Sequence, residues 1–209
     1  MYVPPFNRVE ELDEIREMVA ATAAAWVVTT GPDGVPLATL LPVLWEGDRV
    51  IAHLARANDH WRSIEDGTPV LVICPGPDAY ISPTWYAAKA EHGRVVPTWN
   101  YTAVHLTGTA VVHHDPAWLL SAVTSLTDAH EGGRAEPWSV SDAPTAYVEG
   151  QLRGIVGLEI TVTGVEGKAK LSQNRSAADR SGVVAGLRAA GEARSAAVAE
   201  AMDGSGRSQ

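Results

Sequence analysis

Only one cysteine occurs among the 209 residues of the chain, so no disulfide can form within it. This usage is typical of proteins from a reducing compartment. The thiol, Cys74, lies in the apolar run 70–74, which favours a buried structural role over that of a nucleophile. The first residues lack the basic start of a signal peptide, and no segment approaches the length of a membrane span. We therefore expect a cytoplasmic protein that does not bind membranes.

The chain also has few basic side chains. The 16 Lys and Arg residues are outnumbered by 25 Asp and Glu residues, which gives a formal net charge of −9. Such a surface repels phosphate backbones unless it carries a local basic patch, and the sequence has no dense run of Lys and Arg. Nor is there a convincing helix-turn-helix spacing. Hence we expect no specific binding to nucleic acid.

The spacings that mark metal, nucleophile and phosphate sites are missing as well. The seven His residues form no His-Glu-x-x-His motif, and there is no Cys-x-x-Cys pair. A nucleophile elbow and a Gly-rich phosphate loop are likewise missing. His53 and His105 lie in predicted strands, where a histidine more often belongs to the core than to a ligand set. These motifs therefore assign no function.

Short segments with turn signals between them predict a mainly β fold. Neither βαβ alternation nor an internal repeat occurs, which favours a barrel or a sandwich. Strands are expected at 26–30, 35–45, 49–55, 70–74, 79–82, 102–113, 155–165 and 168–172. Helices are expected at 9–25 with Asn7 as its cap, at 58–65 with Asn58 as its cap, and at 116–130, 145–153 and 177–202. The segment 75–77 is expected to interrupt a strand, and 86–95 and 131–143 to form loops.

Aromatic usage is uneven, with seven Trp and five Tyr but one Phe. Trp and Tyr combine a flat ring with a polar atom, so they suit a site that stacks on a planar ligand and hydrogen-bonds to it. Two segments, 80–86 and 96–101, mix these aromatics with Pro and small hydroxyl residues. Such segments form rigid walls of binding sites. Ordinary packing at the ends of a barrel and at an interface is the alternative.

Residues 52–61 offer an anion site in the predicted structure. They pass from a strand into the beginning of a helix, where free backbone N–H groups and the positive end of the helix dipole attract negative charge. Arg56 adds a forked donor that suits phosphate or carboxylate. A capped helix with a surface arginine is the alternative interpretation. The polar stretch 168–175 follows a buried strand and, taken singly, is typical of a solvated loop.

Several longer motifs follow one another along the chain. They are Met1-Tyr2-x-Pro4, His53-x-Ala55-Arg56-Ala57-Asn58-x-x-Trp61, Ala79-Tyr80-Ile81-Ser82-Pro83-x-Trp85-Tyr86, Val95-Val96-Pro97-Thr98-Trp99-Asn100-Tyr101, Ile155-Val156-Gly157 and Lys170-Leu171-Ser172-Gln173-Asn174-Arg175. With these motifs the chain resembles the PaiB-like proteins, described as FMN-binding negative transcriptional regulators, up to about residue 187. The resemblance implies an α+β fold that is mainly β with flanking helices. This is a dimeric split β-barrel of the FMN-binding type, with the cofactor at the subunit interface.

We accordingly expect a cofactor-binding domain with an N-terminal helix at 1–175, a helical extension at 176–202 and a disordered tail at 203–209. The resemblance implies that the acidic group of the cofactor is held by Arg56, Asn58 and His60. It also implies that His53 lies beside the flat ring of the cofactor. Residues 99–100 and 170–174 would wall the groove. The full set of expected cofactor-binding residues is His53, Arg56, Asn58, His60, Trp61, Ser82, Trp99, Asn100, Ala169, Ser172, Gln173 and Asn174.

Three positions depart from the family pattern and alter the expected cofactor. Ala169 replaces a Trp between two lysines, and Leu40 and Asp78 each replace a His. The loss of bulk at Ala169 opens the groove, which favours a cofactor larger than FMN. One branch of the family, the piperazate synthases, uses haem b to close N5-hydroxyornithine into a cyclic hydrazine by forming an N–N bond. The chain is similar to that branch in having a roomier groove.

The resemblance thus predicts a haem-dependent N–N bond-forming enzyme that makes piperazic acid from a hydroxylated diamino acid and works as a homodimer. His53 is the expected axial ligand, with His60 and His105 as alternatives. The iron would act as a Lewis acid on the N–OH group, and Tyr80, Glu91 or Lys170 would take the proton of the attacking amine. The alternative is an FMN-binding PaiB-like protein that acts as a flavin-dependent oxidoreductase or a transcriptional regulator.

Overall fold

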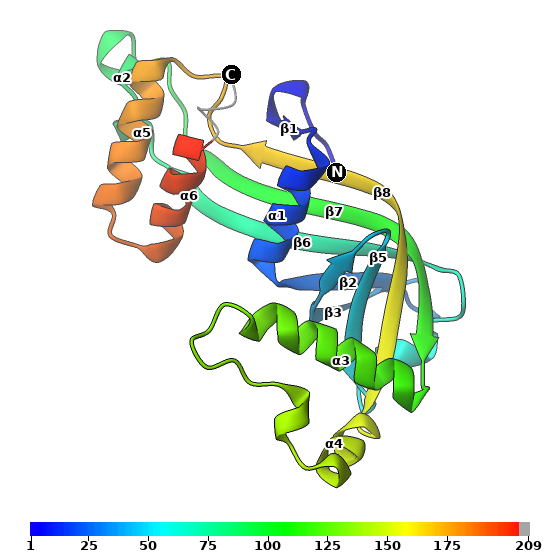
Figure 1. The fold of residues 1–209 in the computed structure, drawn as a ribbon. Helices are drawn as coiled ribbons and strands as arrows, with labels where there is room; N and C mark the ends of the chain where they lie inside the picture. The colour runs from blue at the N-terminus through cyan, green and yellow to red at the C-terminus, as the bar shows by residue number, and fades with distance from the viewer. Residues whose placement is uncertain (205–209) are drawn as a thin grey trace. The chain divides into compact units, whose positions relative to one another are not determined.

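The computed structural model describes residues 1–204, which form two compact units. The first, which we call the helical unit, comprises 1–15, 75–104 and the described chain from 166 onward. The second, the sheet unit, comprises 16–74 and 105–165. Four elements contribute residues to both units (Figure 1): α1 (Leu12–Thr22), β6 (Thr68–Ile81), β7 (Thr98–His113) and β8 (Ile155–Lys170).

The sheet unit is built from strands that pair in antiparallel fashion. Besides its parts of β6, β7 and β8 it contains β2 (Ala24–Thr30), β3 (Pro36–Pro42), β4 (Leu44–Glu46) and β5 (Arg49–Ala55). The hydrogen-bonded order is β3-β2-β6-β7-β8-β5-β4, and the pairs β2–β3, β2–β6, β4–β5 and β5–β8 are antiparallel. Along β5 the buried residues Val50, Ala52 and Leu54 alternate with less buried ones. His53 therefore lies on the face of β5 opposite to this core.

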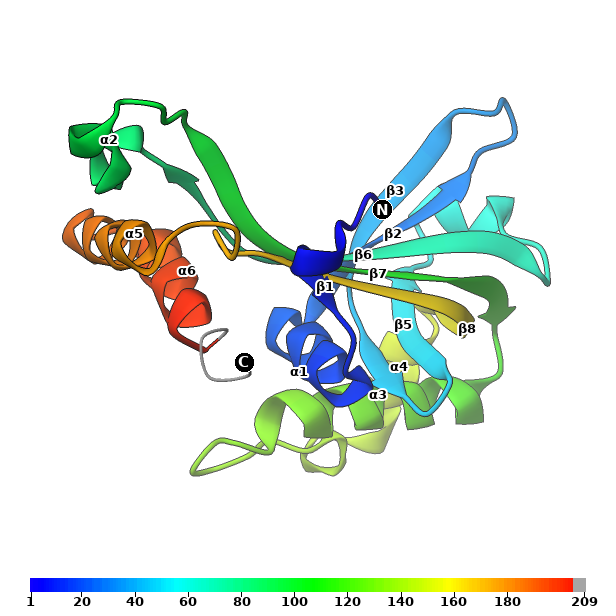
Figure 2. The same cartoon turned by 90° about the horizontal axis from the view of Figure 1, so that it is seen from above.

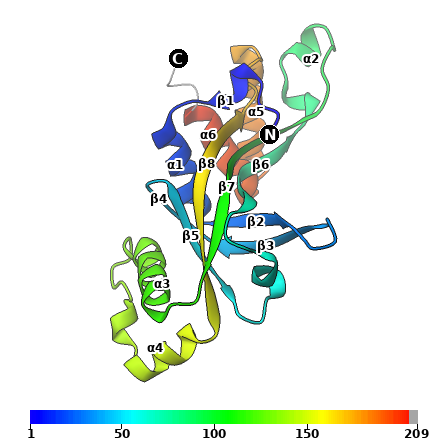
Figure 3. The same ribbon diagram turned by 90° about the vertical axis from the view of Figure 1, so that its right-hand side faces the viewer.

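Helix α3 (Pro116–Glu131) packs on β5 within this unit (Figures 1 and 3). Asp115 caps its first turn, because its carboxylate accepts a hydrogen bond from the N–H of Trp118 at 3.0 Å. The indole of Trp118 lies against Gly157, where any side chain would overlap the ring. The remaining elements of the unit are η2 (Asp59–Ser63), η4 (Val140–Asp142) and α4 (Thr145–Leu152).

The helical unit contains the helices α5 (Ala177–Ala189) and α6 (Ala193–Gly204), which pack against each other (Figures 1 and 2). Ser176 caps α5 by accepting from the N–H of Asp179. The buried faces of both helices join residues from the end of β6, the residue after η3 and the residue after β8 in one core cluster: Ala79, Ile81, Tyr86, Leu171, Val183, Leu187, Val198, Ala199 and Met202. The other elements are η1 (Pro5–Asn7), β1 (Arg8–Val9), η3 (Pro83–Trp85) and α2 (Ala88–Glu91).

The sequence predicted an interruption of a strand at two places. In the described residues both strands are continuous there. The segment 75–77 stays within β6. Gly76 explains this continuity, because it has no side chain and so lets Thr102 of β7 approach closely; a Cβ atom there would overlap the Thr102 hydroxyl. Strand β8 also continues through 166–167, where it pairs with β1 by placing Gly167 opposite Val9.

The terminal helices also differ from the prediction. Helix α1 begins at Leu12, and Asn7 is buried in η1, where it caps no helix. The single helix predicted at 177–202 is two helices, because Gly191 adopts a φ of 71° between them and ends the first. Asp203 and Gly204, which were assigned to the disordered tail, complete α6, and the rest of that prediction, 205–209, lies outside the described residues.

Most of the remaining elements agree with the prediction. The strand at 49–55 and the helices near 116–130 and 145–153 are confirmed, and Asn58 caps η2 as expected. The short helix α2 lies in the predicted loop 86–95. The fold class, mainly antiparallel β with flanking helices, is confirmed. Within residues 1–204, no helix combines the length and apolar character needed to cross a membrane.

Gly182 determines how closely α5 can approach η3. A methyl group at this position would overlap the carbonyl oxygen of Trp85, and a backbone atom cannot rotate away. We expect Gly182→Ala to lower the free energy of unfolding by about 1–3 kcal/mol, in spite of the better helix propensity of alanine, as measured by urea denaturation. Gly150→Ala in α4 is the matched control, because its methyl group would lie 3.7 Å from the nearest atom, on Arg153. Equal losses in the two variants would contradict the packing argument.

Candidate functional site

A pocket of about 500 Å³ lies in the helical unit. Its walls come from the N-terminal segment, Tyr86, the beginning of β7 with the two residues before it, the end of β8 and the turn that follows β8. Its volume is within the usual range for small-molecule sites. We call it the lysine–tyrosine pocket, and its lining residues are Tyr2, Pro4, Phe6, Asn7, Tyr86, Val96, Pro97, Thr98, Asn100, Tyr101, Lys168, Lys170, Ser172, Asn174 and Arg175.

Two lysines and one arginine line this pocket, and none of its described lining residues is acidic. The buried ammonium of Lys168 donates to the carbonyl of Tyr2 at 3.0 Å and to the hydroxyl of Tyr101 at 2.6 Å. The ammonium of Lys170 donates to the Thr98 hydroxyl at 2.7 Å and to the carbonyl of Trp99 at 2.8 Å. Because these partners are neutral, the positive charge is not cancelled, and the pocket attracts an anion.

Tyr86 and Arg175 meet at one wall of the pocket. The guanidinium carbon of Arg175 lies 4.7 Å from the centre of the Tyr86 ring, a cation–π arrangement. Tyr86 is 3% exposed, and its hydroxyl has no hydrogen-bond partner within residues 1–204. A buried hydroxyl without a partner costs about 1–3 kcal/mol. A ligand that supplied the missing hydrogen bond would recover part of that cost.

Ser172 adopts a φ of 61°, in the left-handed region that residues other than glycine rarely occupy. Its buried hydroxyl pairs with the fully buried amide of Asn100: the amide nitrogen donates to the hydroxyl oxygen at 3.0 Å, and the hydroxyl lies 3.3 Å from the amide oxygen. Strained backbone of this kind gathers at functional sites. The pair holds the turn after β8 against β7, where both segments line the pocket.

The predicted site residues of the helical unit are only partly brought together. Asn100, Lys170, Ser172 and Asn174 line the pocket. Trp99 and Tyr80 are about half exposed and pack edge to face with their ring centres 6.3 Å apart. They do not belong to the lining, although the carbonyl of Trp99 accepts a hydrogen bond from Lys170.

Four further predicted residues of the helical unit lie away from the lining. Ser82 caps η3, and Glu91 is exposed on α2. The Gln173 side chain bonds the backbone of Leu171 and Ala169. Ala169 itself packs against the core cluster, so its small side chain does not enlarge the lysine–tyrosine pocket.

Five tyrosine or charged lining residues were not selected from the sequence. Every one of them lies in or beside a motif that carried the resemblance, and this neighbourhood is the signal that could have identified them. They are Tyr2, Tyr86, Tyr101, Lys168 and Arg175.

In the sheet unit, His60 has partners at both ring nitrogens. Nε2 lies 2.9 Å from the hydroxyl of Thr29 and Nδ1 lies 2.8 Å from the hydroxyl of Thr39. The amide of Asn58 donates to the same Thr39 hydroxyl and accepts from the backbone N–H of His60. Burial lowers the pKa of His60. The ring is thus held neutral with neither nitrogen left over for an anion or an iron atom.

Arg56 and Trp61 are also bonded within the sheet unit. The guanidinium of Arg56 donates to the carbonyls of Arg153 at 2.9 Å and Ile155 at 3.0 Å, and its own carbonyl accepts from the indole N–H of Trp61. Arg56 also lines a pocket of about 360 Å³ beside α3 and α4. Its remaining N–H groups are the donors that an acidic group could still use.

His53 differs from His60 because its Nδ1 has no hydrogen-bond partner within residues 1–204. The residue is half-buried on β5, and desolvation lowers its pKa, which favours the neutral imidazole. His105, also half-buried, lies on β7 and has an interaction partner. Within the described chain, no group of three or more His, Cys, Asp or Glu side chains is placed to hold a metal ion.

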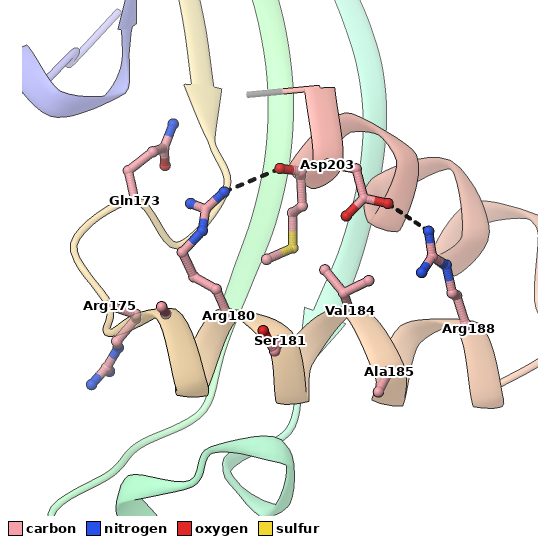
Figure 4. A pocket seen from close by; sticks show the side chains of 10 residues that line it. Gln173, Arg175, Arg180, Ser181, Val184, Ala185, Arg188 and Asp203 are labelled. Atoms are coloured by element: carbon pink, nitrogen blue, oxygen red, sulfur yellow. Dashed lines mark hydrogen bonds and ion pairs between the residues drawn. The ribbon is translucent and has the colours of Figure 1, made fainter. Parts of the chain in front are cut away.

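A larger pocket, of about 640 Å³, lies beside α5 and the end of α6 (Figure 4). Two of its arginines are already partnered. Arg180 donates to the carbonyls of Leu171 and Met202 at 3.1 Å each, and Arg188 pairs with Asp203. Figure 4 shows Arg175 extending away from the Arg188–Asp203 pair. Arg180 and Arg188 therefore join α5 to α6.

Residues 1–164 match the family model described as "Putative FMN-binding domain". The chain is 36% identical to "Protease synthase and sporulation protein PAI 2" of Bacillus subtilis (strain 168) over 188 residues, which cover 88% of this chain and 87% of that protein.

Two solved structures share the fold at low sequence identity. The FAD and heme binding protein from Mycobacterium smegmatis superposes with a TM-score of 0.61 at 17% identity, covering 89% of this chain and 80% of that one. The flavocytochrome Anf3 from Azotobacter vinelandii gives a TM-score of 0.57 at 18% identity, covering 80% and 72%. The predicted fold, of the split-barrel type, is thereby confirmed.

The lowered pKa of His60 predicts a pH dependence of stability. The unfolded chain binds a proton at about pH 6.5, whereas burial disfavours the charged ring in the folded state. The contribution of His60 is therefore present above about pH 6.5 and is lost as the pH falls below it. In urea denaturation we expect the native chain to lose more stability between pH 7.5 and 5.5 than His60→Gln does. His130→Gln, at an exposed position of α3, is the control and should follow the native chain. Identical losses in all three proteins would refute this role of burial.

Proposed function

Because this chain belongs to the family of FMN-binding domains, we propose that it binds FMN in the lysine–tyrosine pocket and acts as a flavin-dependent oxidoreductase. The observation that carries the proposal is the charge of the pocket. Lys168, Lys170 and Arg175 face a space that no described acidic residue lines. The phosphate of FMN is a dianion at neutral pH, and such a site attracts it.

The other lining groups also fit FMN. Tyr101 offers a flat ring, and the buried hydroxyl of Tyr86 has no partner among the described residues. Thr98 and Asn174 add polar atoms at the wall. The volume of about 500 Å³ lies within the range of cofactor sites. The donor set therefore suits an aromatic ligand with an acidic end.

Bound FMN would supply hydride transfer. The chain's own part is to bind and orient the cofactor and to offset negative charge. Lys168 is held by two hydrogen bonds and Lys170 by two more, so their positive charges keep fixed positions. Charges fixed in this way cost no reorganisation when negative charge increases nearby.

The first test is Tyr86→Phe, which removes only the hydroxyl. In the free protein this group has no partner, so we expect unchanged or slightly higher thermal stability. FMN affinity, measured by quenching of flavin fluorescence, should fall about 2- to 10-fold, as for the loss of one hydrogen bond.

Tyr147→Phe, at an exposed position of α4, is the matched control and should leave both quantities unchanged. A native chain that does not quench FMN fluorescence would contradict the proposal itself. If the Tyr86→Phe variant keeps full FMN affinity, the hydroxyl of Tyr86 makes no hydrogen bond to FMN.

A second candidate function is favoured by one observation, the unpartnered Nδ1 of His53. A neutral, half-buried imidazole is the form that ligates haem iron. Haem would supply a Lewis acid for the N–O bond of N5-hydroxyornithine. The α-amine would displace the hydroxyl group, so that an N–N bond forms and water leaves. We place this candidate second because Ala169, whose small size suggested a roomier groove, packs against the core cluster.

His53→Ala tests the haem candidate. If the ring is the axial ligand, haem added to the native chain should give a Soret band that shifts or disappears in the variant, because the iron loses its nitrogen ligand. His130→Ala, at an exposed position on α3, serves as the control and should keep the native spectrum. The same Soret band in native chain and His53→Ala would exclude His53 as the ligand.

Three other expectations stay predictions: a homodimer, a cytoplasmic location and the lack of specific nucleic-acid binding. The half-exposed aromatic pair of Tyr80 and Trp99 supplies apolar surface of the kind that interfaces use. The net charge of −9 favours the oxidoreductase over a regulator that binds DNA directly.

A further inference from the structure

The three cations of the lysine–tyrosine pocket differ in how many donors they have left. An ammonium group has three N–H donors and a guanidinium has five. Lys168 and Lys170 each use two donors on protein oxygens. The guanidinium of Arg175 makes no hydrogen bond or ion pair to residues 1–204, and its one described interaction is the cation–π contact with Tyr86. Arg175 therefore has the largest unused capacity for an anion.

We propose that Arg175 is the phosphate-binding residue of the lysine–tyrosine pocket and makes the pocket select ligands that end in a phosphate monoester over their uncharged counterparts. The inference rests on the proposed function in taking FMN as the ligand. It goes further by naming the one side chain that distinguishes FMN from riboflavin, which has the same ring system without the phosphate.

The local structure positions Arg175 for this role. Its backbone N–H donates to the carbonyl of Ser172 at 3.0 Å, which closes the turn that follows β8. Ser172 is the residue with the left-handed backbone, and its hydroxyl is tied to Asn100. The turn is thus anchored from β7. The guanidinium carbon lies over the Tyr86 ring, and its N–H groups, which make no hydrogen bond within residues 1–204, are available to phosphate oxygens.

The nearby arginines do not share this property. Arg180 is bonded to the carbonyls of Leu171 and Met202, and Arg188 is paired with Asp203. In Figure 4 the Arg175 side chain extends away from this pair. Arg175 lines both the larger pocket and the lysine–tyrosine pocket. The larger pocket is also lined by the acidic Asp203, whereas no described acidic residue lines the lysine–tyrosine pocket.

The experiment compares FMN with riboflavin, using the full chain and quenching of flavin fluorescence. We expect the native chain to bind FMN more tightly than riboflavin. In Arg175→Gln, FMN affinity should fall about 10- to 100-fold, as for the loss of charge-assisted hydrogen bonds, while riboflavin affinity stays the same. Arg175→Lys, which keeps the charge but not the fork, should recover part of the loss. Arg188→Gln is the matched control and should behave like the native chain.

Two results would overturn the inference. Equal losses for FMN and riboflavin in Arg175→Gln would mean that Arg175 only supports the Tyr86 ring. An unchanged FMN affinity in a folded Arg175→Gln protein, checked by circular dichroism, would mean that the lysines hold the phosphate. In both cases FMN still binds, so the proposed function survives.

If the native chain binds no flavin, the proposed function fails, and inorganic phosphate becomes the probe for Arg175. A rise in melting temperature with phosphate in the native chain, but not in Arg175→Gln, would support the anion site by itself. The same response in the native chain and the variant would overturn it.

Discussion

The buried ammonium group of Lys168 is the constraint on which the architecture of the helical unit depends. The residue is 6% exposed, and a buried charge without partners is strongly destabilising. It finds partners in the carbonyl of Tyr2 and the hydroxyl of Tyr101, while the pairing of Arg8 with Lys168 holds β1 against β8. One charge thereby joins the N-terminal segment, β7 and β8. The same three segments contribute to the walls of the pocket, together with Tyr86 and the turn after β8.

Some buried polar groups of this protein have hydrogen-bond partners and others have none. The first kind stabilises the fold, whereas the second kind can bind a ligand. His60 is fully partnered by Thr29 and Thr39, so its role is to join η2 to β2 and β3. The hydroxyl of Tyr86 and the Nδ1 of His53 have no partner within residues 1–204. An unpartnered buried group lowers the stability of the free protein. It is also a group whose hydrogen bond a ligand can complete. The haem candidate starts from such an atom, and the FMN proposal, which rests on the charge of the pocket, uses the Tyr86 hydroxyl as additional support.

The choice between FMN and haem depends on whether the space beside Ala169 belongs to the pocket and on the charges of the side chains that line the pocket. Ala169 suggested extra room when only the sequence was considered, but its side chain faces the core cluster of the helical unit. The uncompensated positive charge of the pocket favours FMN, which carries a phosphate. Its cations come from β8 and the turn after it, and they stand beside tyrosines, a combination that suits a phosphorylated aromatic ligand.

The sequence by itself determined the family and the type of most elements, because long motifs and hydrophobic periodicity are local properties of the chain. It placed β5, α3 and α4 to within about two residues. It could not decide that 75–77 continues β6, because that depends on how closely Thr102 approaches Gly76. Nor could it decide whether Lys170 or Arg175 keeps its N–H donors available for a ligand. Lys170 and Arg175 lie in one motif, yet the oxygens that use the donors of Lys170 come from β7, about 70 residues earlier. Only the tertiary structure brings those oxygens to one lysine and leaves the arginine without them, since the partners of a donor are set by packing between distant segments.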